Sequence, residues 1–163
     1  MAKRDEKRDP KSTRKVGATP NEHWKDDPDE HDYPAASDYL SLLLPDASVG
    51  PVVEALKGAP DFHRKAKDLL RASRLALLDE SNPHVADDLA KVRRGGYLSP
   101  VLIVRGSLYA DLPLTVADGY HRICASFHLD ENADIPCRMA DSPQPSGASG
   151  DDAAGTGNTA AAP

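Results

Sequence analysis

Residues 114–129 read LTVADGYHRICASFHL, and this stretch decides the fold. Its first four residues are mostly apolar and include the β-branched Thr115 and Val116, which predicts a strand. After Asp118 and Gly119, apolar side chains recur at helical spacing from Tyr120 to Leu129, which predicts a helix. We therefore expect Asp118 and Gly119 to form a strand-to-helix junction.

The flanking sequence supplies further elements of a small domain. Residues 82–94 have a capping Asn, a Pro at the first helical position and a buried apolar stripe, which predict a helix. The apolar runs 100–104 and 135–139 predict two more strands. The order helix, strand, strand, helix, strand predicts an α/β (α+β) fold over residues 80–140.

A helical cap is expected before this domain, over residues 33–79. Three helices are predicted there, at residues 37–44, 51–58 and 61–78, from Pro and Gly boundaries and from leucines at helical spacing. The cap has two interpretations. It covers one side of the sheet, or it engages a protein partner.

The two ends of the chain have compositions typical of disorder. Residues 1–32 are dense in charge and poor in apolar side chains, and residues 141–163 are rich in Gly, Ala, Ser and Pro. We expect a disordered charged arm and a disordered tail.

Charge is unevenly distributed along the chain, whose formal net charge is −6. Residues 1–15 are basic, residues 16–32 are acidic, and residues 33–140 are almost neutral. A broad positive field for nucleic-acid binding is therefore not expected in the folded part. Weak nucleic-acid contact through the basic arm and a merely solubilising arm both remain open.

The sequence contains no apolar run long enough to cross a bilayer and no apolar leader segment. We expect a cytoplasmic protein without membrane contact. Cys124 and Cys137 lack a CxxC spacing, so we expect reduced thiols.

The chemistry is predicted at Asp118, Gly119, Tyr120, His121 and Arg122. The first turn of a helix exposes backbone N–H groups and the positive end of its dipole, so it attracts anions. Gly119 lets a phosphate approach those amides, Arg122 offers a bidentate guanidinium, and His121 offers a hydrogen bond or a proton. The segment therefore predicts a phosphate-binding turn.

A purely structural interpretation of the same residues stays open. Asp118 is then a helix cap, Gly119 a turn residue and Arg122 half of a surface ion pair. His84 and Asp88 are four residues apart and could share a metal, but two ligands are too few, and an exposed helix face is the better explanation of the spacing.

Two segments together resemble the N-terminal domain of the ParB/sulfiredoxin superfamily: LAKVRRGGYLSPVLIVRG at 89–106 and PLTVADGYHRICASFHLDENADIPCRM at 113–139. The shared pattern is a strand with Pro and Val, a second strand running into a Gly-x-His-Arg turn, a helix with Ala, and a strand with Ile-Pro. The resemblance covers about residues 82–139.

The resemblance implies a ParB-like protein that binds a nucleotide of the CTP or ATP class with Mg²⁺. Gly119, His121 and Arg122 match the family's phosphate-binding turn. Four alternatives for its function stay open. They are nucleotide hydrolysis, phosphate transfer, a nuclease-like activity, and a non-enzymatic role as a module that binds a protein or nucleic acid. Sulfiredoxins carry their catalytic cysteine where this chain has Tyr120, so sulfinic acid reduction is not expected. A general base is left open among Asp87, Asp88, Asp118 and His121.

Overall fold

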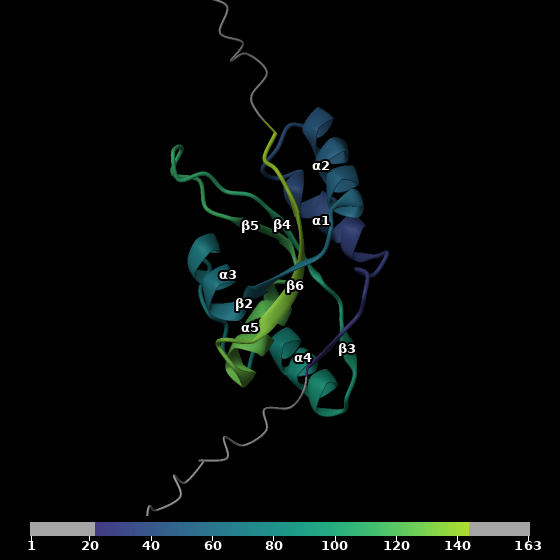
Figure 1. The fold of residues 1–163 in the computed structure, drawn as a ribbon, viewed down its shortest axis with the longest axis vertical. Coiled ribbons are helices and arrows are strands. Elements are labelled where there is room, and N and C mark those ends of the chain that lie inside the picture. Colours follow the sequence, from purple (N-terminus) through teal and green to yellow (C-terminus); the bar gives the residue numbers. More distant parts are fainter. Residues whose placement is uncertain (1–21, 144–163) are drawn as a thin grey trace, which may run out of the picture.

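Strand β4 (Val101–Val104) is buried at all four residues, because helices cover both faces of its sheet. The structure is a computed structural model, and it describes residues 22–143 (Figure 1). Alternate side chains of a strand point to opposite faces, so a strand without polar residues suits this sandwiched position.

The main sheet contains four strands in the order β2-β6-β4-β5. They are β2 (Phe62–Lys65), β4, β5 (Thr115–Asp118) and β6 (Asp134–Ala140). Strand β6 runs parallel to β4 and antiparallel to β2, and β4 runs antiparallel to β5. A second, two-stranded parallel sheet joins β1 (His23–Trp24) to β3 (Tyr97–Leu98).

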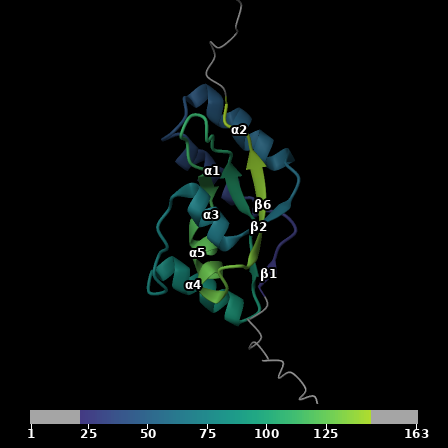
Figure 2. The ribbon, with the colours of Figure 1, turned by 60° about the vertical axis from the view of Figure 1, so that its left-hand side comes forward.

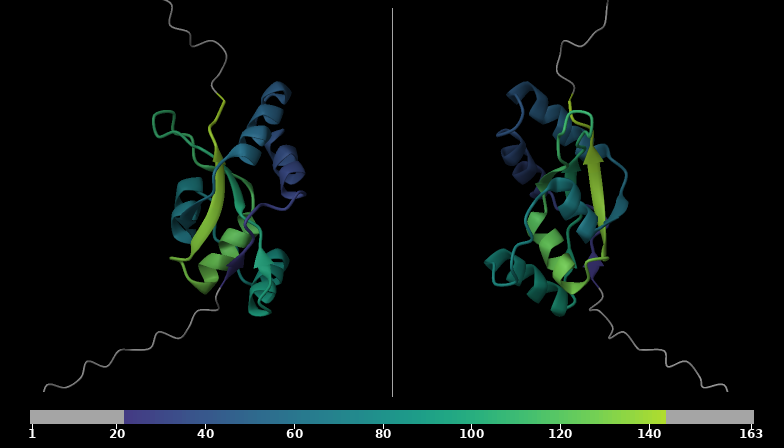
Figure 3. Two further views of the ribbon diagram at one scale, coloured as in Figure 1. Left: turned by 45° about the vertical axis from the view of Figure 1, so that its right-hand side comes forward. Right: turned by 90° about the vertical axis from the view of Figure 1, so that its left-hand side faces the viewer.

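Within residues 22–143, five helices surround the main sheet. They are α1 (Asp32–Leu40), α2 (Asp46–Gly58), α3 (Ala66–Ser73), α4 (Pro83–Arg93) and α5 (Tyr120–Leu129). Helices α1 and α2 lie on one side of the sheet, and α3 and α5 lie on the other (Figure 3). Helix α4 packs against α5 at the end of the molecule opposite α2 (Figure 2).

The two faces of the sheet belong to two hydrophobic clusters. Val101 and Ile103 pack with α3, α4 and α5, whereas Leu102 and Val104 pack with α1 and α2. Of the helices in the predicted cap, α1 and α2 therefore cover one face of the sheet and α3 covers the other. The first of them begins and ends earlier than the predicted 37–44.

The mixed α/β fold expected from the sequence is confirmed. The predicted junction is also present, because β5 ends at Asp118 and α5 begins at Tyr120. Helix α4 matches its prediction, and the side chain of Asn82 accepts hydrogen bonds from the amides of His84 and Val85, at 3.1 and 3.3 Å.

The helix predicted over residues 61–78 is wrong at both ends. Residues Phe62–Lys65 form the edge strand β2, which pairs with β6 far along the chain. Helix α3 then ends at Ser73, because Arg74 adopts a left-handed conformation with φ of 57°.

The expected disordered arm is also corrected in part. Residues 22–32 contain β1 and the first residue of α1, and Asp32 is buried. Residues 1–21 and 144–163, which hold the basic arm and most of the predicted tail, lie outside the described residues. Within residues 22–143, no helix is both long and apolar enough to cross a membrane.

Candidate functional site

The amino terminus of α5 is open toward one pocket. Gly119 precedes the helix with φ of 101°, and no side chain caps the first turn. The first hydrogen bond within the helix is the one that the amide of Ile123 donates to the carbonyl of Gly119, at 3.0 Å. The amides of residues 120–122 therefore have no acceptor within the helix. The interpretation of Asp118 as a helix cap is therefore not supported.

This pocket has a volume of about 190 Å³ and lies between the start of α4 and the start of α5. Its lining residues are His84, Asp87, Asp88, Asp118, Gly119, His121 and Arg122. The structure thus brings four of the five predicted turn residues together with three residues of α4. We call this set the α5 pocket.

Tyr120 is the predicted turn residue that does not line the α5 pocket. Its hydroxyl donates to the carbonyl of Ala76, and its ring packs against the hydrophobic cluster that contains Val101. Tyr120 can contribute only its backbone amide to a ligand at the turn.

The guanidinium of Arg122 is held by two carboxylates. Nη2 donates to Asp118, and Nη1 lies 3.5 Å from Oδ1 of Asp32. The side chain of Arg122 is only 15% exposed, so this is not the surface ion pair of the structural interpretation. Its buried Nε has no hydrogen-bond partner within residues 22–143, so this N–H is unused by the protein.

Asp32 is a site residue that sequence reasoning missed. Its side chain is 2% exposed. Oδ2 accepts from the hydroxyl of Ser99 and from the amide of Asp29, the latter at 3.2 Å. These partners fix the carboxylate that holds Arg122. No local pattern in the charged segment around Asp32 distinguishes it from its exposed acidic neighbours.

Burial shifts the acid strengths of two pocket carboxyls. Burial raises the pKa of Asp118 above its ordinary value, and the nearby Arg122 guanidinium opposes this rise. The pKa of Asp88 is likewise raised by burial, with Arg122 and Lys91 opposing. Both groups therefore take up protons more readily than an exposed aspartate.

Two histidines face each other at the pocket. The ring centroids of His84 and His121 are 4.7 Å apart. Burial, followed by the charge of His84, lowers the pKa of His121 below its ordinary value. The neutral form of His121 is therefore favoured at neutral pH, where it can accept or donate one hydrogen bond.

A group that could hold a metal lies beside the α5 pocket. Across residues 22–143, the ligand atoms of Asp29, His31 and Asp32 lie within 4.8 Å of one another. These side chains already have cationic partners, because Lys25 contacts Asp29 at 2.6 Å and Arg122 contacts Asp32. A metal there would have to displace them.

The α5 pocket combines anion donors with metal-type ligands. Free helix amides and Arg122 attract phosphate oxygens, whereas carboxylates of Asp87, Asp88 and Asp118 are the oxygen ligands that Mg²⁺ prefers. Such a mixed set suits an anion that arrives with its own divalent cation.

Comparisons with known proteins give no relative: no family model, no curated protein and no solved structure matches this chain.

Proposed function

We propose that this chain is a ParB-like protein that binds the phosphates of a nucleotide, together with Mg²⁺, at the turn Asp118 to Arg122. The observation that carries the proposal is the uncapped amino terminus of α5, which opens into a pocket shared by Arg122 and three carboxylates. The resemblance to the ParB/sulfiredoxin superfamily supports the same turn as the phosphate site.

The charge of the α5 pocket argues for a bound cation. Three aspartates face one arginine and two histidines, so a bare phosphate would be repelled once the carboxyls are ionised. These carboxylates do not form a preassembled metal cage. Mg²⁺ bound to nucleotides commonly uses one or two carboxylates, waters and the phosphates themselves, and Asp88 and Asp118 would hold it in this manner.

The size of the α5 pocket restricts what it encloses. Its volume of about 190 Å³ is below the range of about 300 to 1,000 Å³ that is typical of sites for whole drug-sized ligands. The phosphates would therefore lie inside the pocket, and the sugar and base would lie outside it.

Calorimetric titration with CTP, ATP and ADP, each with and without Mg²⁺, tests the proposal. We expect binding of at least one of them that requires Mg²⁺. Release of phosphate in the same samples distinguishes hydrolysis from binding alone. If none of the three binds with Mg²⁺ present, the proposed function is wrong.

A non-enzymatic module that binds a protein partner is the second candidate. The end of α1 and the turn after it expose Tyr39, Leu42 and Leu43, at 41%, 78% and 54%. A double variant L42S/L43S should reduce capture of such a partner without changing nucleotide binding. Equal capture by the variant and the unmodified chain would exclude this surface.

A further inference from the structure

A second, larger cavity lies beside α3, on the face of the main sheet opposite to α1 and α2. It has a volume of about 560 Å³, within the range of about 300 to 1,000 Å³ typical of small-molecule sites. Its apolar floor is formed by Phe62, Leu69, Ile103, Leu114 and Met139. We call it the α3 cavity.

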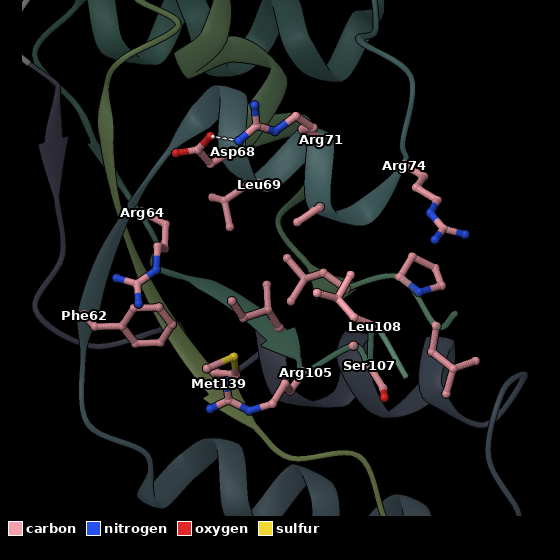
Figure 4. Close-up of a pocket in the computed structure, with 16 residues that line it drawn as sticks. Phe62, Arg64, Asp68, Leu69, Arg71, Arg74, Arg105, Ser107, Leu108 and Met139 are labelled. Carbon is pink, nitrogen blue, oxygen red and sulfur yellow. Dashed lines mark hydrogen bonds and ion pairs between the residues drawn. The ribbon is translucent and has the colours of Figure 1, made fainter. Parts of the chain in front are cut away.

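Arginines surround this apolar floor. Arg64, Arg71, Arg74 and Arg105 line the cavity, and Asp68 is the acid among its lining residues. Figure 4 shows the four arginines on different sides, with Leu69 between them. The lining of the α3 cavity is therefore rich in arginine, in a chain whose net charge is −6.

The four arginines differ in their availability to a ligand. Arg74 contacts Asp111, and Arg105 contacts Asp141 at 2.7 Å, in pairs whose side chains are all more than half exposed. Arg64 stacks over the ring of Phe62 at 4.6 Å and has no acidic partner within residues 22–143. Arg71 contacts Asp68 at 3.1 Å, but 84% of the Arg71 side chain is exposed. Such exposed pairs contribute little, so a bound anion can replace the acid.

The α3 cavity is separate from the α5 pocket. Leu114, which lines the cavity, precedes the first residue of β5, whereas Asp118 in the α5 pocket is the last residue of that strand. The segment between β4 and β5 forms another wall and contributes Ser107 and Leu108. It projects from the body of the molecule (Figure 1).

We propose that the α3 cavity binds a small organic anion with an apolar body. The apolar body lies on Leu69, Ile103 and Met139, and the anionic group lies at the rim, where arginines grip it. A guanidinium binds a carboxylate or a phosphate with two parallel hydrogen bonds, so both head groups fit. The same surface gives a neutral molecule no comparable contact.

Titration of the isotope-labelled full chain by nuclear magnetic resonance tests this inference. The probes are octanoate, octyl phosphate and 1-octanol, which share a chain length and differ in charge. We expect both anions to shift the amide signals of residues around Leu69, Ile103 and Met139. The dissociation constant of 1-octanol should be at least about tenfold larger. The ratio between the two anions identifies the preferred head group.

A charge-removing variant provides the second arm. R64Q/R71Q changes two exposed side chains, and R93Q, on the exposed side of α4, is the matched control. The double variant should bind octanoate about tenfold more weakly, and R93Q should bind it unchanged. Thermal unfolding of the double variant checks that it is folded.

Three results would overturn the proposal. They are equal affinity for 1-octanol and octanoate, unchanged octanoate binding in a folded R64Q/R71Q, or amide shifts that lie outside the α3 cavity. None of these results bears on nucleotide binding at the α5 pocket.

Discussion

Arg122 and Asp32 contact each other across ninety positions of sequence, with Nη1 3.5 Å from Oδ1. Asp32 begins α1 on one side of the sheet, and Arg122 lies in the first turn of α5 on the other. The pair thereby joins the two helical layers at the α5 pocket. Because Asp32 is almost fully buried, its carboxylate has lost contact with water, and its contacts with Arg122, Ser99 and the amide of Asp29 offset that loss.

Replacing Asp32 should therefore destabilise the fold. Breaking a buried ion pair costs about 3 to 5 kcal/mol, and we expect D32A to lose about 2 to 3 kcal/mol because Arg122 keeps Asp118 as a partner. Urea unfolding measures the loss. D38A, at an exposed position of the same helix, should stay within about 0.5 kcal/mol of the unmodified chain. Equal stability of D32A and the unmodified chain would contradict the role of the pair.

Gly119 should not tolerate alanine. Its φ is 101°, and an added Cβ would lie 2.9 Å from Cγ2 of Val101 and 3.0 Å from Nη2 of Arg122. G119A should lose about 1 to 3 kcal/mol of unfolding free energy and should weaken nucleotide binding. G50A is the matched control, because Gly50 lies within α2 and its Cβ would meet nothing within 4 Å. It should gain about 0.5 to 1 kcal/mol. A stable G119A would refute the steric argument.

Arg122 should decide nucleotide affinity. Loss of a charge-assisted hydrogen bond costs about 1.5 to 3 kcal/mol, so R122A should bind the Mg²⁺ nucleotide roughly 10- to 150-fold more weakly. R122K keeps the charge near Asp32 and separates binding from folding. It should unfold closer to the unmodified chain than R122A does, yet bind weakly, because lysine cannot grip two phosphate oxygens at once. R93A is the calorimetric control, and undiminished binding by folded R122A would exclude this role.

The affinity for Mg²⁺ nucleotide should fall on acidification. Cation binding needs ionised carboxyls, and burial raises the pKa of Asp88 and Asp118. As pH falls through these raised values, both groups take up protons and affinity is lost, beginning above the ordinary aspartate pKa of about 3.9. Titrations from about pH 7.5 to 4.5 measure the profile.

The nucleotide's own phosphate also titrates near pH 6, so D88N in the same buffers is the comparison. D88N removes one titrating group, and its affinity should change less with pH than that of the unmodified chain. An affinity that is independent of pH, or that rises on acidification, would exclude carboxylate ligands at the α5 pocket.

Both thiols should be inert in the native state. Cys124 and Cys137 are completely buried, and burial raises the pKa of Cys137 to about 12 and that of Cys124 above its ordinary value. A thiol reagent such as dithionitrobenzoate should react with neither until urea unfolds the chain, and then with both. Reaction of either thiol in native buffer at the rate of a free thiol would show that the core around it opens.

The turn and helix α5 could be predicted from sequence because their signals are local. Gly119 and the apolar spacing from Tyr120 to Leu129 lie within one short stretch, and the structure has α5 over that same range. Strand β2 lacks such a signal. Its residues Phe62–Lys65 are only partly buried, and its pairing partner β6 lies about seventy residues further on.

The site was predictable only in part, for the same reason. Arg122 and Gly119 are visible in the motif, but the burial of Asp32 depends on Ser99 and on the packing of α1, which no pattern in residues 22–32 reveals. High charge density predicted disorder there, and tertiary contacts overrode it. The basic rim of the α3 cavity is dispersed over residues 64–105 and emerges only when α3 packs on the sheet.

The order β2-β6-β4-β5 has a consequence for biosynthesis. Strand β6 is the last element of the described chain, yet it separates β2 from β4 in the sheet. While residues 134–140 are still inside the ribosome, the emerged chain can form the β4–β5 hairpin. At that stage β2 has no neighbouring strand to pair with, and α2 has no β6 to pack against. The sheet must therefore close late, from its middle, after almost every other described element has left the exit tunnel.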